Sequence, residues 1–135
     1  MPAEPGLAMQ IVIPADVQFF RPVRLAVGGL GALVGFDVDA IEDLRIGVDE
    51  LCGTAHDAGD GSDIAIAVTV EVGSTIRVEC STPLGPTAID DDRFQFSRRI
   101  LSVVADEHGL EASDGTIRCW LERSLSDAQV DTDAP

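Results

Sequence analysis

Two polar residues whose side chains could take part in catalysis or ligand binding, Glu50 and Thr54, stand one helical turn apart in this sequence. They lie in the stretch Ile41–Ala55, where apolar residues recur at helical spacing. Residues four apart share a helical face, so a carboxylate and a hydroxyl point the same way there. Such a pair can accept and donate protons or hold a ligand. The alternative is structural: Glu50 caps a helix or pairs with Arg45 or another base.

The remaining reactive residues show no catalytic or metal-binding spacing. His56 and His108 have no acid and hydroxyl partners at a recognisable spacing, so we expect surface histidines. The three cysteines are widely separated, without a Cys-x-x-Cys motif, and sit in apolar stretches, which favours buried, reduced thiols.

Composition predicts one acidic globular domain. The chain has 135 residues, 45% of them apolar, and 24 acids against nine bases give a net charge of −15. This charge argues against nucleic acid and anionic membranes as partners. All nine bases are Arg, which suits directional, bidentate contacts. We expect an ordered domain over residues 9–124 with loose tails at 1–8 and 125–135, no membrane-spanning segment, and a cytoplasmic location.

Hydrophobic periodicity predicts the elements that must position these side chains. Helices are expected over 17–34, capped by Asp16, from Asp37 or Asp39 to about 58–59, and over 96–105. Strands are expected over 9–14, 63–72, 75–80 and 116–121 with a short one around Leu110, a hairpin turn at 73–74, and an acidic loop over 81–92. This order predicts an α+β, two-layer sandwich: a mostly antiparallel sheet of four to five strands covered on one face by three helices.

The helical patterns also predict which side chains face the core. The expected buried residues of the second and third helices are Ile41, Leu44, Ile46, Val48 and Leu51, then Ile100, Leu101, Val103 and Val104, with Phe94 and Phe96 as core anchors. In the first helix, Gly28, Gly29 and Gly31 weaken helix formation, so we expect its backbone to pack closely against a neighbour.

The pattern Ile-x-x-Leu-Arg-Ile-x-Val-Asp-Glu, over 41–50, resembles the corresponding helix of histidine-kinase-like ATPases of the GHKL group. With the element order, it more closely resembles anti-sigma factor kinases of the RsbW type over Gln10 to Arg123. The resemblance implies that Glu50 is a general base and that Thr54 replaces an Asn that holds the magnesium of bound ATP. It also places a partner-contact arginine of the first helix at Arg24, with Arg21 beside it.

The nucleotide motifs of that family are altered in this chain. Where the family has Asp-x-Gly, the sequence runs Cys-Ser-Thr-Pro-Leu-Gly over 80–85, so Thr82 and Gly85 are the candidate adenine contacts and the Asp is missing. Where the family has a Gly-rich lid, three acids and two bulky phenylalanines stand over 90–97. The Gly115–Thr116 turn matches the pattern, which makes Thr116 a further candidate contact.

Two functional hypotheses follow from this resemblance. The first is an anti-sigma factor that clasps a sigma factor as a homodimer and releases it to a STAS-type antagonist, in a stress response, without a bound cofactor. The second is an ATP- and magnesium-dependent serine kinase that phosphorylates that antagonist, with Glu50 as base. The altered motifs favour the first hypothesis.

Overall fold

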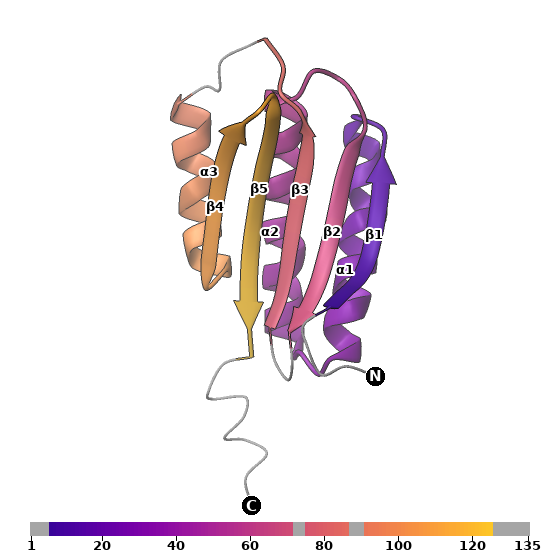
Figure 1. Ribbon diagram of the computed structural model, residues 1–135. Helices are drawn as coiled ribbons and strands as arrows, with labels where there is room; N and C mark the ends of the chain where they lie inside the picture. Colours follow the sequence, from indigo (N-terminus) through magenta and orange to yellow (C-terminus); the bar gives the residue numbers. More distant parts are fainter. Residues whose placement is uncertain (1–5, 72–74, 87–90, 126–135) are drawn as a thin grey trace, which may run out of the picture.

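The computed structural model describes residues 6–71, 75–86 and 91–125. The predicted turn at 73–74 and most of the predicted tails lie outside these ranges. Along the chain, the elements are β1 (Gly6–Ile13), η1 (Val17–Phe19), α1 (Phe20–Leu33), α2 (Val38–Ala58), β2 (Ile64–Glu71), β3 (Thr75–Pro83), α3 (Asp91–Val104), β4 (Glu107–Ser113) and β5 (Thr116–Ser124) (Figure 1). No helix in these ranges is long and apolar enough to cross a membrane.

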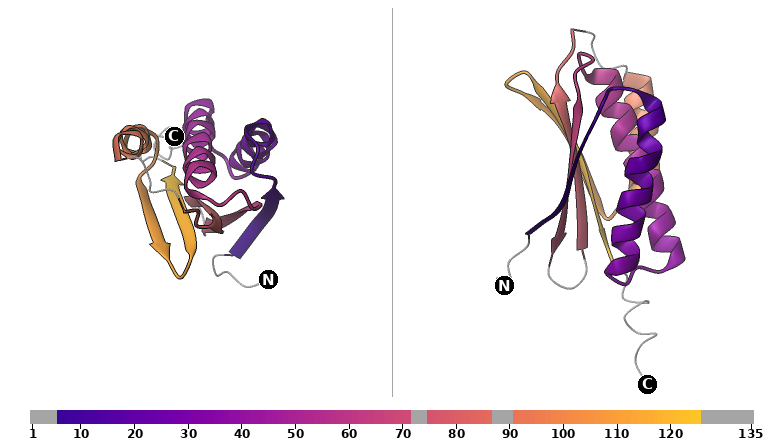
Figure 2. Two further views of the ribbon diagram at one scale, coloured as in Figure 1. Left: turned by 90° about the horizontal axis from the view of Figure 1, so that it is seen from above. Right: turned by 90° about the vertical axis from the view of Figure 1, so that its right-hand side faces the viewer.

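The strands form one antiparallel sheet in the order β1-β2-β3-β5-β4. All the helices lie against one face of this sheet (Figure 2). The predicted α+β sandwich is therefore confirmed. Inward residues alternate along the central strands, as in Ile64, Ile66 and Val68 of β2, which are fully buried. The core lies between these strands and α2.

The glycines of α1 allow close packing against α2. A Cβ on Gly31 would lie 3.0 Å from a methyl carbon of Leu44, and one on Gly28 would lie 3.4 Å from Arg45. The predicted close approach is confirmed at these two positions. It is wrong for Gly29, which faces open space. The predicted N-cap Asp16 caps the short 3-10 helix η1 and not α1: it accepts a hydrogen bond from the Gln18 amide at 3.1 Å, whereas the N-cap position of α1 is Phe19, whose side chain makes no capping bond. Hydrogen bonds from Gln18 lower the pKa of Asp16.

Three predicted core residues instead face solvent. Ile46 is 39% exposed, Phe96 62% and Val103 82%. In α3, the buried stripe consists of Ser97, Leu101 and Val104, spaced by four and three residues. Phe96 and Val103 are each one residue before that stripe, which turns them about 100° away from it.

Three element boundaries differ from the prediction. β3 continues to Pro83 and α3 begins at Asp91, so the segment predicted as a loop over 81–92 is much shorter. Pairing with β5 extends β3, because Ser81, Thr82 and Pro83 align with Arg118, Ile117 and Thr116. β1 begins at Gly6, three residues earlier than predicted, because it pairs with the end of β2.

Candidate functional site

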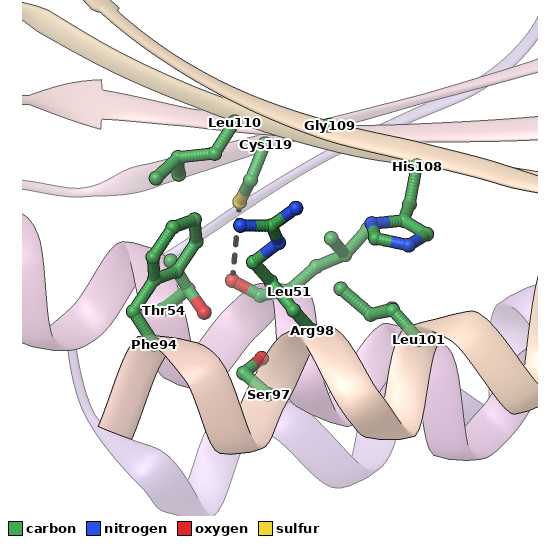
Figure 3. A pocket seen from close by; sticks show the side chains of 10 residues that line it. All are labelled: Leu51, Thr54, Phe94, Ser97, Arg98, Leu101, His108, Gly109, Leu110 and Cys119. Atoms are coloured by element: carbon green, nitrogen blue, oxygen red, sulfur yellow. Dashed lines mark hydrogen bonds between the residues drawn. The ribbon is translucent and has the colours of Figure 1, made fainter. Parts of the chain in front are cut away.

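The candidate site lies where α2 and α3 run side by side, and it has two hollows. The outer cleft has a volume of about 270 Å³ between the two helices. Its lining residues are Asp49, Glu50, Gly53, Thr54, Arg93, Phe96 and Ser97. The inner cavity has a volume of about 310 Å³ and lies between the helices and strands β4 and β5 (Figure 3). Its lining residues are Leu51, Thr54, Phe94, Ser97, Arg98, Leu101, His108, Gly109, Leu110 and Cys119.

Glu50 and Thr54 are brought together as the helical spacing predicts. Both side chains are half-buried and line the outer cleft. Among the described residues, the Glu50 carboxylate has no hydrogen bond or ion pair. The predicted structural pairing with Arg45 is wrong, because Arg45 pairs with Glu42 at 3.6 Å, one turn away on the same helix. Glu50 is therefore a carboxylate that lines a cleft and has no partner within residues 6–71, 75–86 and 91–125.

Ser97 forms the wall between the outer cleft and the inner cavity, and sequence reasoning missed it. It is 6% exposed, and its Oγ is buried with no hydrogen-bond partner in the part of the chain described. Helical serines often donate to the carbonyl four residues earlier. Ser102 does this, with its Oγ 2.8 Å from the Arg98 carbonyl oxygen. A buried hydroxyl without a partner costs about 1–3 kcal/mol, so Ser97 is a polar group that a ligand could satisfy.

Ion pairs frame the outer cleft at both ends. Arg93 of α3 pairs with Asp57 near the end of α2 at 2.5 Å. At the other end, Nη1 of Arg24 lies 2.5 Å from Oδ1 of Asp49, which joins α1 to α2 beside Glu50. The Arg24 side chain is 28% exposed. Arg24, the predicted partner contact, therefore touches a wall residue of the cleft, whereas Arg21 is exposed on the first turn of α1.

The predicted nucleotide contacts Thr82, Gly85 and Thr116 lie near one another where α2, β3 and β5 meet. Thr82 is 3% exposed, and its hydroxyl donates to the Asp63 carbonyl at 2.9 Å. The Gly85 amide donates to the Ala58 carbonyl at 2.8 Å. Thr116 is half-buried and pairs with Pro83 in the sheet. These three residues lie near the end of α2 but line neither the outer cleft nor the inner cavity.

The prediction for the cysteines is confirmed, whereas the prediction for His108 is wrong. His108 was expected on the surface, but it is half-buried and lines the inner cavity, where Nε2 lies 3.3 Å from Ser102 Oγ. The cysteines are all buried and free, as predicted. Cys80 and Cys119 are register partners on β3 and β5. Hydrogen bonding with the Cys119 and Cys52 thiols, together with burial, raises the pKa of Cys80.

Comparisons with known proteins identify structures with the same fold. No protein-family model matches the chain. A serine-protein kinase RsbW from Bacillus velezensis is 38% identical over 47 residues, which are 35% of this chain and 29% of that protein. The crystal structure of the RsbU and RsbW domains of a Mycobacterium tuberculosis protein matches with a TM-score of 0.70 and 17% identity, over 93% of this chain and 34% of that one.

A second solved structure extends the comparison. The SiaB–SiaC complex from Pseudomonas aeruginosa contains a chain that matches with a TM-score of 0.59 and 10% identity, over 88% of this chain and 91% of that one. The chain thus has the fold of an RsbW domain, a single sheet covered by helices. The predicted resemblance to RsbW-type anti-sigma factor kinases is confirmed.

Proposed function

We propose that this chain is a partner-switching protein of the anti-sigma type that acts by binding proteins and has lost nucleotide binding. In this proposal it holds a sigma factor and releases it when a STAS-type antagonist takes its place. The observation that carries the proposal is the contact between the end of α2 and the segment after β3. There the Gly85 amide donates to the Ala58 carbonyl, and beside it the Thr82 hydroxyl, near the end of β3, donates to the carbonyl of Asp63, just before β2.

These contacts support the loss of the nucleotide because they occupy the groups expected to receive adenine. The Thr82 hydroxyl already donates its hydrogen bond to the Asp63 carbonyl. Thr82 also lacks the carboxylate that the family's Asp offers to adenine. A Cβ on Gly85 would overlap the Gly59 carbonyl oxygen, so Gly85 is required by the protein's own backbone. Asp92, in the first turn of α3, adds negative charge at the helix end that would otherwise attract a triphosphate. These three features support the proposal that the chain has lost ATP binding.

The helical layer supports protein docking, because it exposes large apolar side chains beside Arg residues. Leu25 on α1 is 55% exposed, and Phe96 on α3 is 62% exposed. Arg21 and Arg24 lie on the same helix as Leu25. Aromatic residues and Arg are enriched at protein interfaces, and Arg is among the residues that contribute most of the binding energy. The net charge of −15 suits a partner with a basic surface, such as a sigma factor.

Calorimetry with Mg-ATP tests the loss of the nucleotide site. We expect no binding in the micromolar range, with a catalytically competent RsbW-type kinase as the positive control. Micromolar binding would contradict the proposal. Protein binding is tested separately by a pull-down from the host's own extract at low salt, where recovery of a sigma factor supports the proposal and its absence contradicts it.

One observation favours the second hypothesis, an active serine kinase acting on a STAS-type antagonist. Glu50 is a half-buried carboxylate in a cleft without a partner among the described residues, so its oxygens are free to accept a proton from a bound substrate. Transfer of phosphate from ATP to the antagonist, abolished by Glu50→Gln, would establish this function. Absence of transfer at millimolar Mg-ATP would exclude it.

Homodimer formation and a cytoplasmic role in a stress response belong to the same proposal. Sedimentation of the free chain and of the chain with its sigma factor measures the oligomeric state directly. A mass that corresponds to one copy in both samples would contradict the dimer without affecting the proposed loss of the nucleotide.

A further inference from the structure

We propose that the inner cavity is a binding site for a small carboxylic acid with an apolar body. The inner cavity adjoins the outer cleft of Glu50, with which it shares the lining residues Thr54 and Ser97, but Glu50 itself does not line it. Its volume of about 310 Å³ is at the lower end of the range for small-molecule pockets. The inference does not depend on whether the chain binds a sigma factor.

The walls of the inner cavity define the body of the ligand. Leu51 comes from α2, Leu101 and the Phe94 ring from α3, and Leu110 from β4. Figure 3 shows these side chains around a common space between the helices and the sheet. Such walls favour an uncharged hydrocarbon group, because it leaves water without requiring any polar partner.

Two basic groups define the head of the ligand. Arg98 rises from α3 toward the sheet, and His108 extends from β4 toward the helices (Figure 3). Arg98 contacts the face of Phe94, with its Cζ 5.6 Å from the ring centroid, and has no carboxylate partner among the described residues. A guanidinium at a cavity with no acidic partner in the described part of the chain is available to an anion. A carboxylate matches the planar guanidinium through two parallel hydrogen bonds.

A second, independent observation is that a hydroxyl group in the wall of the inner cavity has no hydrogen-bond partner among the described residues. The buried Oγ of Ser97 has no hydrogen bond in the described structure, and Ser97 lines this cavity together with the Thr54 hydroxyl. A bound carboxylate can accept hydrogen bonds from hydroxyls as well as from Arg98. The acid would thus satisfy a donor that the protein leaves unsatisfied.

Titration of phenylacetate, followed by the NMR signals of leucine methyl groups, tests the site. We expect saturable shifts at Leu51, Leu101 and Leu110, which line the inner cavity. Phenylacetamide, the neutral isostere, should bind about tenfold more weakly, because it lacks the charge-assisted bond to Arg98. Equal affinity for the acid and the amide would overturn the proposal, as would shifts confined to residues outside this cavity.

Substitutions on α3 provide the matched controls. Arg98→Gln should weaken phenylacetate binding about tenfold and leave phenylacetamide binding unchanged. Arg99→Gln, which removes an equal charge from an exposed neighbour outside the cavity, should change neither. If both variants weaken the acid equally, the effect is general charge attraction and the proposal fails. Circular dichroism confirms the folding of each variant.

Arg98→Lys is a second test of the same contact. Lysine keeps the positive charge but cannot form two parallel hydrogen bonds with a carboxylate. Phenylacetate should therefore bind Arg98→Lys more weakly than the natural chain and more tightly than Arg98→Gln. Affinity equal to that of the natural chain would contradict the bidentate geometry.

Discussion

At the scale of single residues, Gly85 has no room for a side chain because the end of α2 lies against it. Its amide bonds to Ala58, and a Cβ would overlap the backbone oxygen of Gly59, which cannot rotate away. We expect Gly85→Ala to lower the free energy of unfolding by about 2 kcal/mol or more. Urea denaturation measures this change.

Gly29→Ala is the matched control for that prediction. Gly29 is exposed in α1 with nothing near its missing Cβ, so alanine should raise the free energy of unfolding by up to about 1 kcal/mol. If Gly85→Ala proves as harmless as Gly29→Ala, the segment after β3 is not held against α2. The proposed loss of nucleotide binding would then have no structural basis at this position.

Ser97 provides a second prediction at this scale, because its buried hydroxyl has no partner in the described structure. Ser97→Ala removes that hydroxyl and should raise the free energy of unfolding of the free protein by about 1 kcal/mol. Ser102→Ala removes a hydroxyl that is already bonded to the Arg98 carbonyl on the exposed side of the helix, so it should give no gain. A loss of stability in Ser97→Ala would mean that Ser97 has a partner in solution.

At the scale of elements, the ion pair between Arg24 and Asp49 joins α1 to α2. Both side chains are partly exposed, at 28% and 43%, so solvent weakens the attraction. A double-mutant cycle with Arg24→Ala and Asp49→Ala should give a coupling energy of about 0.5–1 kcal/mol. Glu50→Ala, next to Asp49 but without a partner among the described residues, should not couple to Arg24. Coupling of Glu50 equal to that of Asp49 would contradict the observed pairing.

The sequence predicted elements well where one periodicity ran without interruption. The alternation of Ile64, Ile66 and Val68 defined β2, and the helical pattern with its capping Asp37 defined α2. The start of α3 was missed, since three consecutive acids suggested a loop. Acids are in fact favourable at a helix N-terminus, because they interact with the helix dipole.

Within the site, the sequence predicted local relationships and missed those between elements. Glu50 and Thr54 share a face because they lie on one helix. The pairs Arg24–Asp49 and Arg93–Asp57 each join two elements, so no sequence spacing reveals them. Ser97 could have been found, since it stands four residues before Leu101 on the stripe that became buried.

At the scale of the whole molecule, the net charge of −15 predicts that added salt raises thermal stability and slows association with a basic partner. Raising the ionic strength from about 0.01 M to 0.15 M shortens the screening length from about 30 Å to 8 Å. Repulsion among exposed acids should then weaken, so the midpoint of thermal unfolding should rise with added NaCl. Association with a basic partner should slow over the same range, which stopped-flow fluorescence measures.

A charge-reduced variant separates repulsion from other effects of salt. Glu107 and Asp114 are exposed acids near the two ends of β4, and Glu107→Gln with Asp114→Asn removes two charges without touching the core. The variant should show a smaller rise in its unfolding midpoint with NaCl than the natural chain. If salt instead lowers the midpoint of both proteins, ion pairs such as Arg77–Glu122 outweigh the repulsion. The acidic surface would then stabilise the fold through its pairs, with partner attraction left to the arginines of the helical layer.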